Sequence, residues 1–223
     1  HGTRNFLKPS AVGLNDLNLS DFLTEMHQQA SQYDNCIAVH CLFDPTEIAA
    51  RAQTFNLEFY GLCRKSQQNQ IWSCFNWFLS KIFSGDNLSY KRLIEGYASY
   101  EKVLGTLRIN STFANHLLLH SIQHILPFNM MLVKHAKRVI LMEEFIEDPN
   151  AHIDQMAFDG AVPKDISVGR MNSHTQRATQ YDFLSDAKET LTKMLEMVEF
   201  NHGGESFTAQ TLEARLIEQS MVA

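Results

Sequence analysis

Several features that define common classes of protein are missing from this chain of 223 residues. It contains no run of about 18 or more uncharged apolar residues, so no transmembrane helix is predicted. Its N-terminal part lacks the basic and then apolar pattern of a signal peptide. The formal net charge is -6, whereas a nucleic-acid binder would normally carry a basic face. We therefore expect a soluble, cytoplasmic protein, in its own cell or in a host cell, with no nucleic-acid partner.

Cysteine is scarce and is not spaced for metal binding. The four cysteines, Cys36, Cys41, Cys63 and Cys74, include no CxxC pair, so we expect reduced thiols that pack in the interior. Cys74 in particular lies in an aromatic segment and is expected to pack rather than to act as a nucleophile. The phosphate-binding GxGxxG and GxxxxGK[ST] motifs, the zinc motif HExxH and the nucleophile motif GxSxG are also absent. No bond-making chemistry, cofactor or metal is expected, which favours a protein that works by binding.

What the chain does have is the apolar periodicity of helices. In the segment Phe43 to Leu62, Asp44 can cap a helix, Pro45 suits its first position and Glu47 completes the spacing of a capping box. The apolar stripe that follows consists of Ile48, Ala52, Phe55, Phe59 and Leu62. This stripe predicts an amphipathic helix that extends to Leu62 and packs on a core.

Similar patterns recur along the chain and predict an all-α protein of about eight or nine helices. Asn35 to Phe43 is interpreted as a buried link and Gly160 to Thr179 as an irregular, polar excursion. Residues 1–35 are expected to form an N-terminal helical extension and residues 36–223 one helical domain. The other predicted helices are Ser20–Gln29, Trp72–Phe83, Tyr90–Leu107, Thr112–Leu126 with Pro127 ending or kinking it, Met130–Glu147, Asp148 to about Phe158, Asp182–Phe200 with Gly203-Gly204 as its stop, and Thr208–Gln219.

Three histidines recur at intervals of four residues in one predicted helix. His116, His120 and His124 share a helix face, and two histidines four positions apart can reach one metal ion. The first and third lie about 12 Å apart along the helix axis, too far for one ion without another ligand. The favoured interpretation is a solvated polar stripe, and a helical metalloprotein or oxidoreductase that uses these histidines is the alternative.

Several segments, taken in order, resemble the catalytic domain of Ras-type guanine-nucleotide exchange factors. The first is the helix from Phe43 to Leu62, with Tyr60 as its last matched residue. The others are Cys74 to Leu88, Tyr90 to Leu119, Val162-Pro163, and Tyr181 to Phe183. The resemblance covers about Leu42 to Leu216 with gaps, and it implies an all-α exchange-factor-like domain with a protruding or irregular hairpin.

The resemblance also implies a partner and a site. The partner would be a small GTPase of the Ras superfamily, and the segment from Pro163 to Arg177 would displace its switch region. Residues implied in the exchange step are Asp165, Met171 and Asn172. Residues implied in partner binding are Arg92, Arg108, Asn110, Arg170 and His174.

A second resemblance involves a different exchange-factor family. The segment Leu117 to Leu132 is similar to part of the Rho-type exchange domain, but the early Glu-x-x-Tyr signature of that family is not found. A further alternative is a scaffold that binds a GTPase without exchange activity. It stays open because the segment after Pro163 is shorter and more polar than the hairpin of the Ras-type family.

Overall fold

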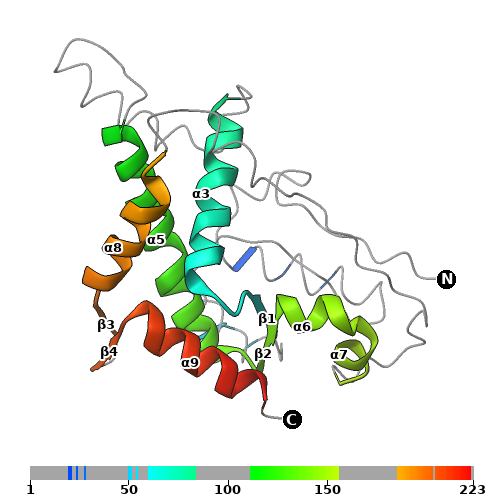
Figure 1. Ribbon diagram of the computed structural model, residues 1–223. Coiled ribbons are helices and arrows are strands. Elements are labelled where there is room, and N and C mark those ends of the chain that lie inside the picture. The colour runs from blue at the N-terminus through cyan, green and yellow to red at the C-terminus, as the bar shows by residue number, and fades with distance from the viewer. Residues whose placement is uncertain are drawn as a thin grey trace. The chain divides into compact units, whose positions relative to one another are not determined.

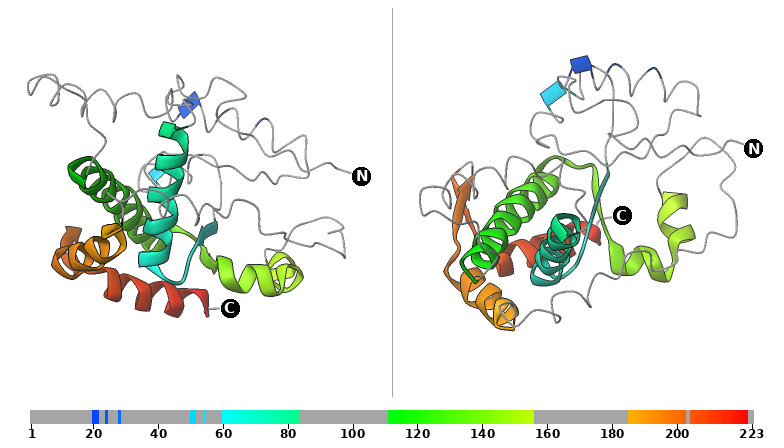
Figure 2. Two further views of the ribbon diagram at one scale, coloured as in Figure 1. Left: turned by 45° about the horizontal axis from the view of Figure 1, so that its top comes forward. Right: turned by 90° about the horizontal axis from the view of Figure 1, so that it is seen from above.

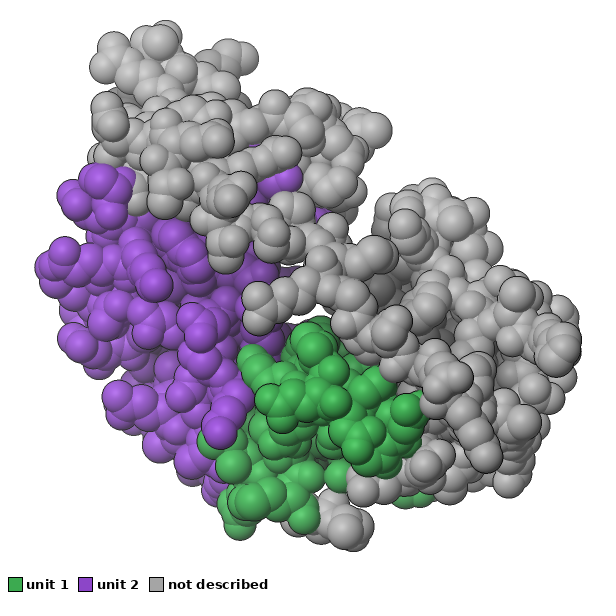
Figure 3. Space-filling model, turned by 45° about the vertical axis from the view of Figure 1, so that its right-hand side comes forward, with its two compact units in different colours: residues 1–63, 130–168, 216–223 green, residues 64–129, 169–215 purple. Residues whose placement is uncertain are grey.

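The structure is a computed structural model in which two compact units are distinguished. It describes residues 20–21, 24, 28, 50–51, 54, 60–83, 111–155, 185–202 and 204–221. These residues are mostly helical (74%), with four short strands among them (Figures 1 and 2). Unit 1 comprises residues 1–63, 130–168 and 216–223, and unit 2 comprises residues 64–129 and 169–215 (Figure 3). Within the described ranges, no helix is both long enough and apolar enough to cross a membrane.

Unit 1 contains a small parallel sheet. Strand β1 (Tyr60–Cys63) pairs with β2 (Arg138–Leu141), and the register places Gly61 opposite Val139. A Cβ atom at Gly61 would lie 3.1 Å from Cδ1 of Leu132, so a side chain here would require Leu132 to shift by a few tenths of an ångström. The sheet is covered from one side at this point by Leu132, which is buried near the end of helix α5 (Ser111–His135).

This sheet corrects two predictions. Ala50 and Arg51 are helical as expected, but the predicted helix to Leu62 is wrong at its end, because Tyr60 to Leu62 belong to β1. The predicted helix Met130–Glu147 is also interrupted, since Arg138–Leu141 form β2. Each strand hydrogen-bonds to the other across a long stretch of sequence, and such pairing overrides the local helical pattern.

The end of β2 leads directly into two short helices of unit 1, α6 (Met142–Glu147) and α7 (Pro149–Gln155). The predicted start of the second helix is confirmed, because the Asp148 carboxylate accepts a hydrogen bond from the Ala151 N–H at 3.0 Å. Pro149 occupies the first helical position, where no N–H is needed. The Asp-Pro pair was therefore a reliable helix-start signal here.

Unit 2 is built on α3 (Gln67–Phe83) and the first part of α5 (Ser111–His135). The two helices run antiparallel, because the start of α3 meets the later part of α5 and Phe78 meets His120. Helix α8 (Ala187–Met197) and the first part of α9 (Ala209–Ser220) complete the unit. Its fully buried side chains include Ile71, Phe75, Leu79, Leu117, Leu118, Leu191 and Leu212.

Pro127 lies inside α5 and does not end it. Proline removes one backbone hydrogen bond from a helix interior and usually kinks the helix. The predicted end of the helix before Pro127 is wrong, because α5 continues to His135, whereas the predicted kink stays a prediction. Buried side chains on both sides of the proline, such as Leu126 and Met130, hold the two parts of this helix in the interior of the protein.

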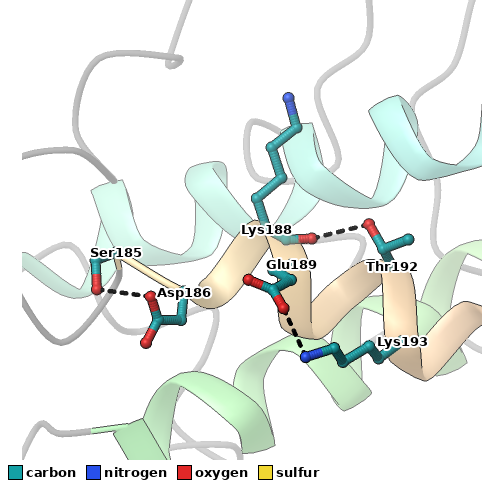
Figure 4. A network of polar contacts seen from close by, with 6 residues as sticks. All are labelled: Ser185, Asp186, Lys188, Glu189, Thr192 and Lys193. Atoms are coloured by element: carbon teal, nitrogen blue, oxygen red, sulfur yellow. Dashed lines mark hydrogen bonds and ion pairs between the residues drawn. The ribbon is translucent and has the colours of Figure 1, made fainter.

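Helix α8 begins later than predicted and ends before Phe200. Ser185 and Asp186 form a turn in which the Ser185 hydroxyl donates to the Asp186 carboxylate, and the first helical residue is Ala187 (Figure 4). Glu189 and Lys193 form an ion pair of 2.6 Å on the exposed face of the helix (Figure 4). Such exposed pairs contribute little to stability.

A β-hairpin connects α8 to α9. Strands β3 (Phe200–His202) and β4 (Glu205–Phe207) are antiparallel, and the rings of Phe200 and Phe207 stack with centroids 5.7 Å apart. Gly204 has a positive φ of 82°, which glycine adopts without strain. The glycine pair was predicted to end a helix, but Gly204 instead lies in the turn of this hairpin. The predicted last helix is confirmed as α9.

The remaining predictions concern residues that are only partly described. Ser20, Asp21, Thr24 and Gln28 are helical, as predicted for Ser20–Gln29, and the Arg51 guanidinium donates to the Ser20 hydroxyl at 2.7 Å. The predicted link Asn35–Phe43, the helix Tyr90–Leu107 and the excursion Gly160–Thr179 lie outside the described residues.

Candidate functional site on the paired helices of unit 2

The residues that the resemblance implied for exchange and partner binding lie outside the described part of the chain. They are Asp165, Met171, Asn172, Arg92, Arg108, Asn110, Arg170 and His174. The described residues do include the other candidate of the sequence, the histidine helix. We call His116, His120 and His124 the histidine face of α5.

The histidine face is less exposed than the sequence suggested. His116 is exposed, but His120 and His124 are half-buried. Phe78 of α3 packs against both of them, with ring centroids 5.1 Å from His120 and 6.4 Å from His124. The prediction of a solvated stripe is therefore wrong for two of the three histidines, because an aromatic residue of the neighbouring helix covers them.

The geometry of this face does not favour a metal centre. The His120 and His124 rings lie nearly parallel, with an interplanar angle of 13° and centroids 6.5 Å apart. The lone pair of an imidazole nitrogen lies in the ring plane, so two stacked rings do not direct their lone pairs at one point between them. Among the described residues, no group of three or more His, Cys, Asp or Glu side chains could hold a metal ion.

Burial sets the protonation of this region. The pKa of His120 is lowered, first by loss of hydration and then by the neighbouring charges of His124 and His116. Burial raises the pKa of the Cys74 thiol to about 12, and a hydrogen bond with Ser121 opposes this effect. Cys74 is a free, half-buried thiol and stays protonated near neutral pH. The partial burial of Cys74 within α3 agrees with the prediction that this thiol packs.

The second polar cluster of the α3–α5 pair was not predicted. We call it the amide cluster: Gln67 and Gln70 of α3, Asn129 of α5, Glu213 of α9 and the backbone of Arg64. The Asn129 amide donates to Gln67 Oε1 at 2.8 Å and to Gln70 Oε1 at 2.9 Å. Gln67 and Asn129 are both fully buried.

Two further contacts fix the start of α3 in this cluster. The backbone N–H of Gln67 donates to Glu213 Oε1 at 2.6 Å, and the N–H of Arg64 donates to Gln70 Oε1 at 3.0 Å. A carboxylate from another helix thereby satisfies a donor that the first helical turn would leave unpaired. The only sequence signal was the amide-rich run from Gln67 to Gln70, and nothing local identified its partners. This cluster aligns helices and offers no reactive group.

Comparisons with known proteins add no family to this description. No protein-family model matches the chain, and neither a curated protein nor a solved structure gives a significant match. What the structure itself defines is a mostly helical protein with two short two-stranded sheets among its described residues.

Proposed function

We propose that the chain binds a small GTPase of the Ras superfamily and promotes release of its bound nucleotide. The observation that carries the proposal is the order of the matched segments along the sequence, from Phe43–Leu62 through Cys74–Leu88 and Tyr90–Leu119 to Val162-Pro163 and Tyr181–Phe183. The segment from Pro163 to Arg177 is assigned the displacement of the switch region. Met171 is its apolar candidate and Asp165 its acidic one.

The described parts of two matched segments are helical, as the resemblance implies. Cys74 to Phe83 lies within α3, and Ser111 to Leu119 opens α5. One detail departs from the resemblance, because Tyr60, the last matched residue of the first segment, lies in strand β1. The proposal therefore depends on the segment order and on the polar segment after Pro163.

An exchange factor needs no catalytic group of its own. It binds most tightly the conformation of the GTPase in which the switch region is displaced and nucleotide is held weakly. By linkage, the factor lowers the affinity for nucleotide by the same ratio by which nucleotide lowers the affinity for the factor. An apolar and an acidic side chain near the metal and phosphate sites are suited to this, since they displace a cation and repel an anion.

The test uses the whole chain and a panel of small GTPases from the Ras, Rap, Ral, Rab and Rho groups, each loaded with labelled GDP. We expect accelerated release from at least one group and a stable complex with its nucleotide-free form. The double variant Asp165→Asn, Met171→Ala should lose most of the acceleration, while the control Glu196→Gln, an exposed change on α8, should keep it.

Three outcomes separate the alternatives. Acceleration that the double variant loses supports exchange through the segment after Pro163. Binding to a nucleotide-free GTPase without acceleration would replace exchange by a scaffold role. No complex and no acceleration with any group would refute the whole proposal.

A further inference from the structure

The α3–α5 pair has a composition that differs from the rest of the chain. The chain contains 25 acidic residues, yet neither α3 with its 17 residues nor α5 with its 25 contains Asp or Glu. The histidine face lies in this acid-free pair of helices. A positive charge that forms on it finds no carboxylate on either helix.

The packing makes such a charge costly at one position above all. His120 is half-buried, its ring lies 5.1 Å from that of Phe78, and the His124 ring lies 6.5 Å away on the same face. Protonation would place a cation in a partly dehydrated contact, between histidines one turn before and one turn after it. Like charges four positions apart on a helix repel one another.

We propose that the histidine face is an acid-sensitive contact within unit 2: protonation of His120 loosens the packing of this end of α5 against Phe78 of α3. The inference is independent of the GTPase proposal, because it uses only residues of the two paired helices. It assigns the three histidines a regulatory role in place of metal binding.

Neither α3 nor α5 contributes an acidic residue near His120. On α5 the nearest titratable groups are His124 and His116, and both lower the pKa of His120. On α3 the facing residues are Phe78, which does not titrate, and in the next turn Cys74, whose pKa of about 12 keeps it neutral.

The direction of the pH effect follows from the direction of the pKa shift. The pKa of His120 is below its ordinary value of 6.5 in the folded protein, so the unfolded or opened form binds a proton first. The contact is fully stable above the ordinary histidine pKa. It weakens as the pH falls through that value. The loss of stability is complete once the pH is below the lowered pKa that His120 has in the folded protein.

The chain provides its own probe for this contact. Both of its tryptophans, Trp72 and Trp77, lie on α3, so tryptophan emission reports on the environment of this helix. We would record the emission spectrum and the urea midpoint of the whole chain from about pH 8 to about pH 5, the range in which histidines titrate. The expected result is a reversible red shift of the emission and a lower urea midpoint on acidification.

Matched variants distinguish His120 from the other histidines. His120→Leu, or His120→Gln if the first variant folds poorly, should remove most of the emission shift. The control is His152→Leu, which replaces another half-buried histidine that contacts a phenylalanine, Phe145 of α6, at 6.2 Å. This control should retain the shift seen in the unmodified chain.

The proposal is overturned by either of two results. The first is an unmodified chain whose emission and urea midpoint do not change across this pH range. The second is a shift that persists unchanged in both His120 variants, because the acid response would then arise elsewhere in the chain.

Discussion

The two ends of the α3–α5 pair place polar side chains between helices in different ways. At the start of α3, the amide cluster buries the neutral side chains of Gln67 and Asn129, and the half-buried Glu213 carboxylate of α9 accepts from the Gln67 N–H. At the other end, His120 and His124 are half-buried against Phe78. Amides do not titrate in the physiological range and imidazoles do. One helix pair therefore contains a contact that is insensitive to pH and another that is sensitive to it.

The largest loss of stability is expected when Phe78, the apolar partner of the histidines, is replaced. Phe78 is only 3% exposed, and Phe78→Ala should lower the free energy of unfolding by about 3–5 kcal/mol through lost burial and a cavity. Urea denaturation at neutral pH measures this change in the free energy of unfolding. Leu119→Ala is the control, because Leu119 is 43% exposed and should cost about 1 kcal/mol or less. Equal losses in the two variants would mean that Phe78 is not part of a packed contact.

An intermediate effect is expected at the amide end. Asn129→Leu removes the donor to Gln67 and Gln70 and should cost about 2–3 kcal/mol, because the buried Gln67 Oε1 loses its donor, whereas Gln70 Oε1 keeps that of the Arg64 N–H. The loss should be the same at acidic and neutral pH, unlike that of the histidine contact. The control Gln68→Leu breaks one hydrogen bond to Thr192 and should cost about 1 kcal/mol. A loss for Asn129→Leu that grows on acidification would contradict the comparison.

The smallest effect concerns the charge in the amide cluster. Glu213→Gln keeps an acceptor for the Gln67 N–H but replaces a charged hydrogen bond by a neutral one, so it should cost about 0.5–1.5 kcal/mol. Thermal unfolding by circular dichroism is sufficient to detect it. Glu196→Gln, on the exposed face of α8, is the matched change and should have almost no effect. If both variants melt alike, the contact of Glu213 with the start of α3 contributes nothing.

Local signals in the sequence predicted helices well where neighbours along the chain decide the structure. Asp148-Pro149 marked the start of α7 because the cap bonds to a residue three positions later. The apolar face predicted for Trp72–Phe83 likewise identified α3. Helix starts and stripes are properties of a single segment, so they can be predicted from that segment alone.

The features that were missed depend on partners far away in the sequence. Tyr60 to Cys63 became a strand because Arg138–Leu141 pair with it, and neither segment alternates in a way that indicates this pairing. The amide cluster joins Gln67 to Glu213 across most of the chain. The burial of His120 likewise depends on Phe78, a residue of another helix. The implied exchange residues lie outside the described part of the chain and stay predictions.

Gly61 also has a consequence for related sequences. A side chain at this position meets Leu132, so the size of residue 61 and the size of residue 132 are linked. In homologues that keep this strand and helix, alanine or serine at position 61 should be accompanied by a smaller residue at position 132. The two positions are 71 apart in the sequence (132 minus 61), so covariation between them in related sequences would indicate that the two residues are in contact.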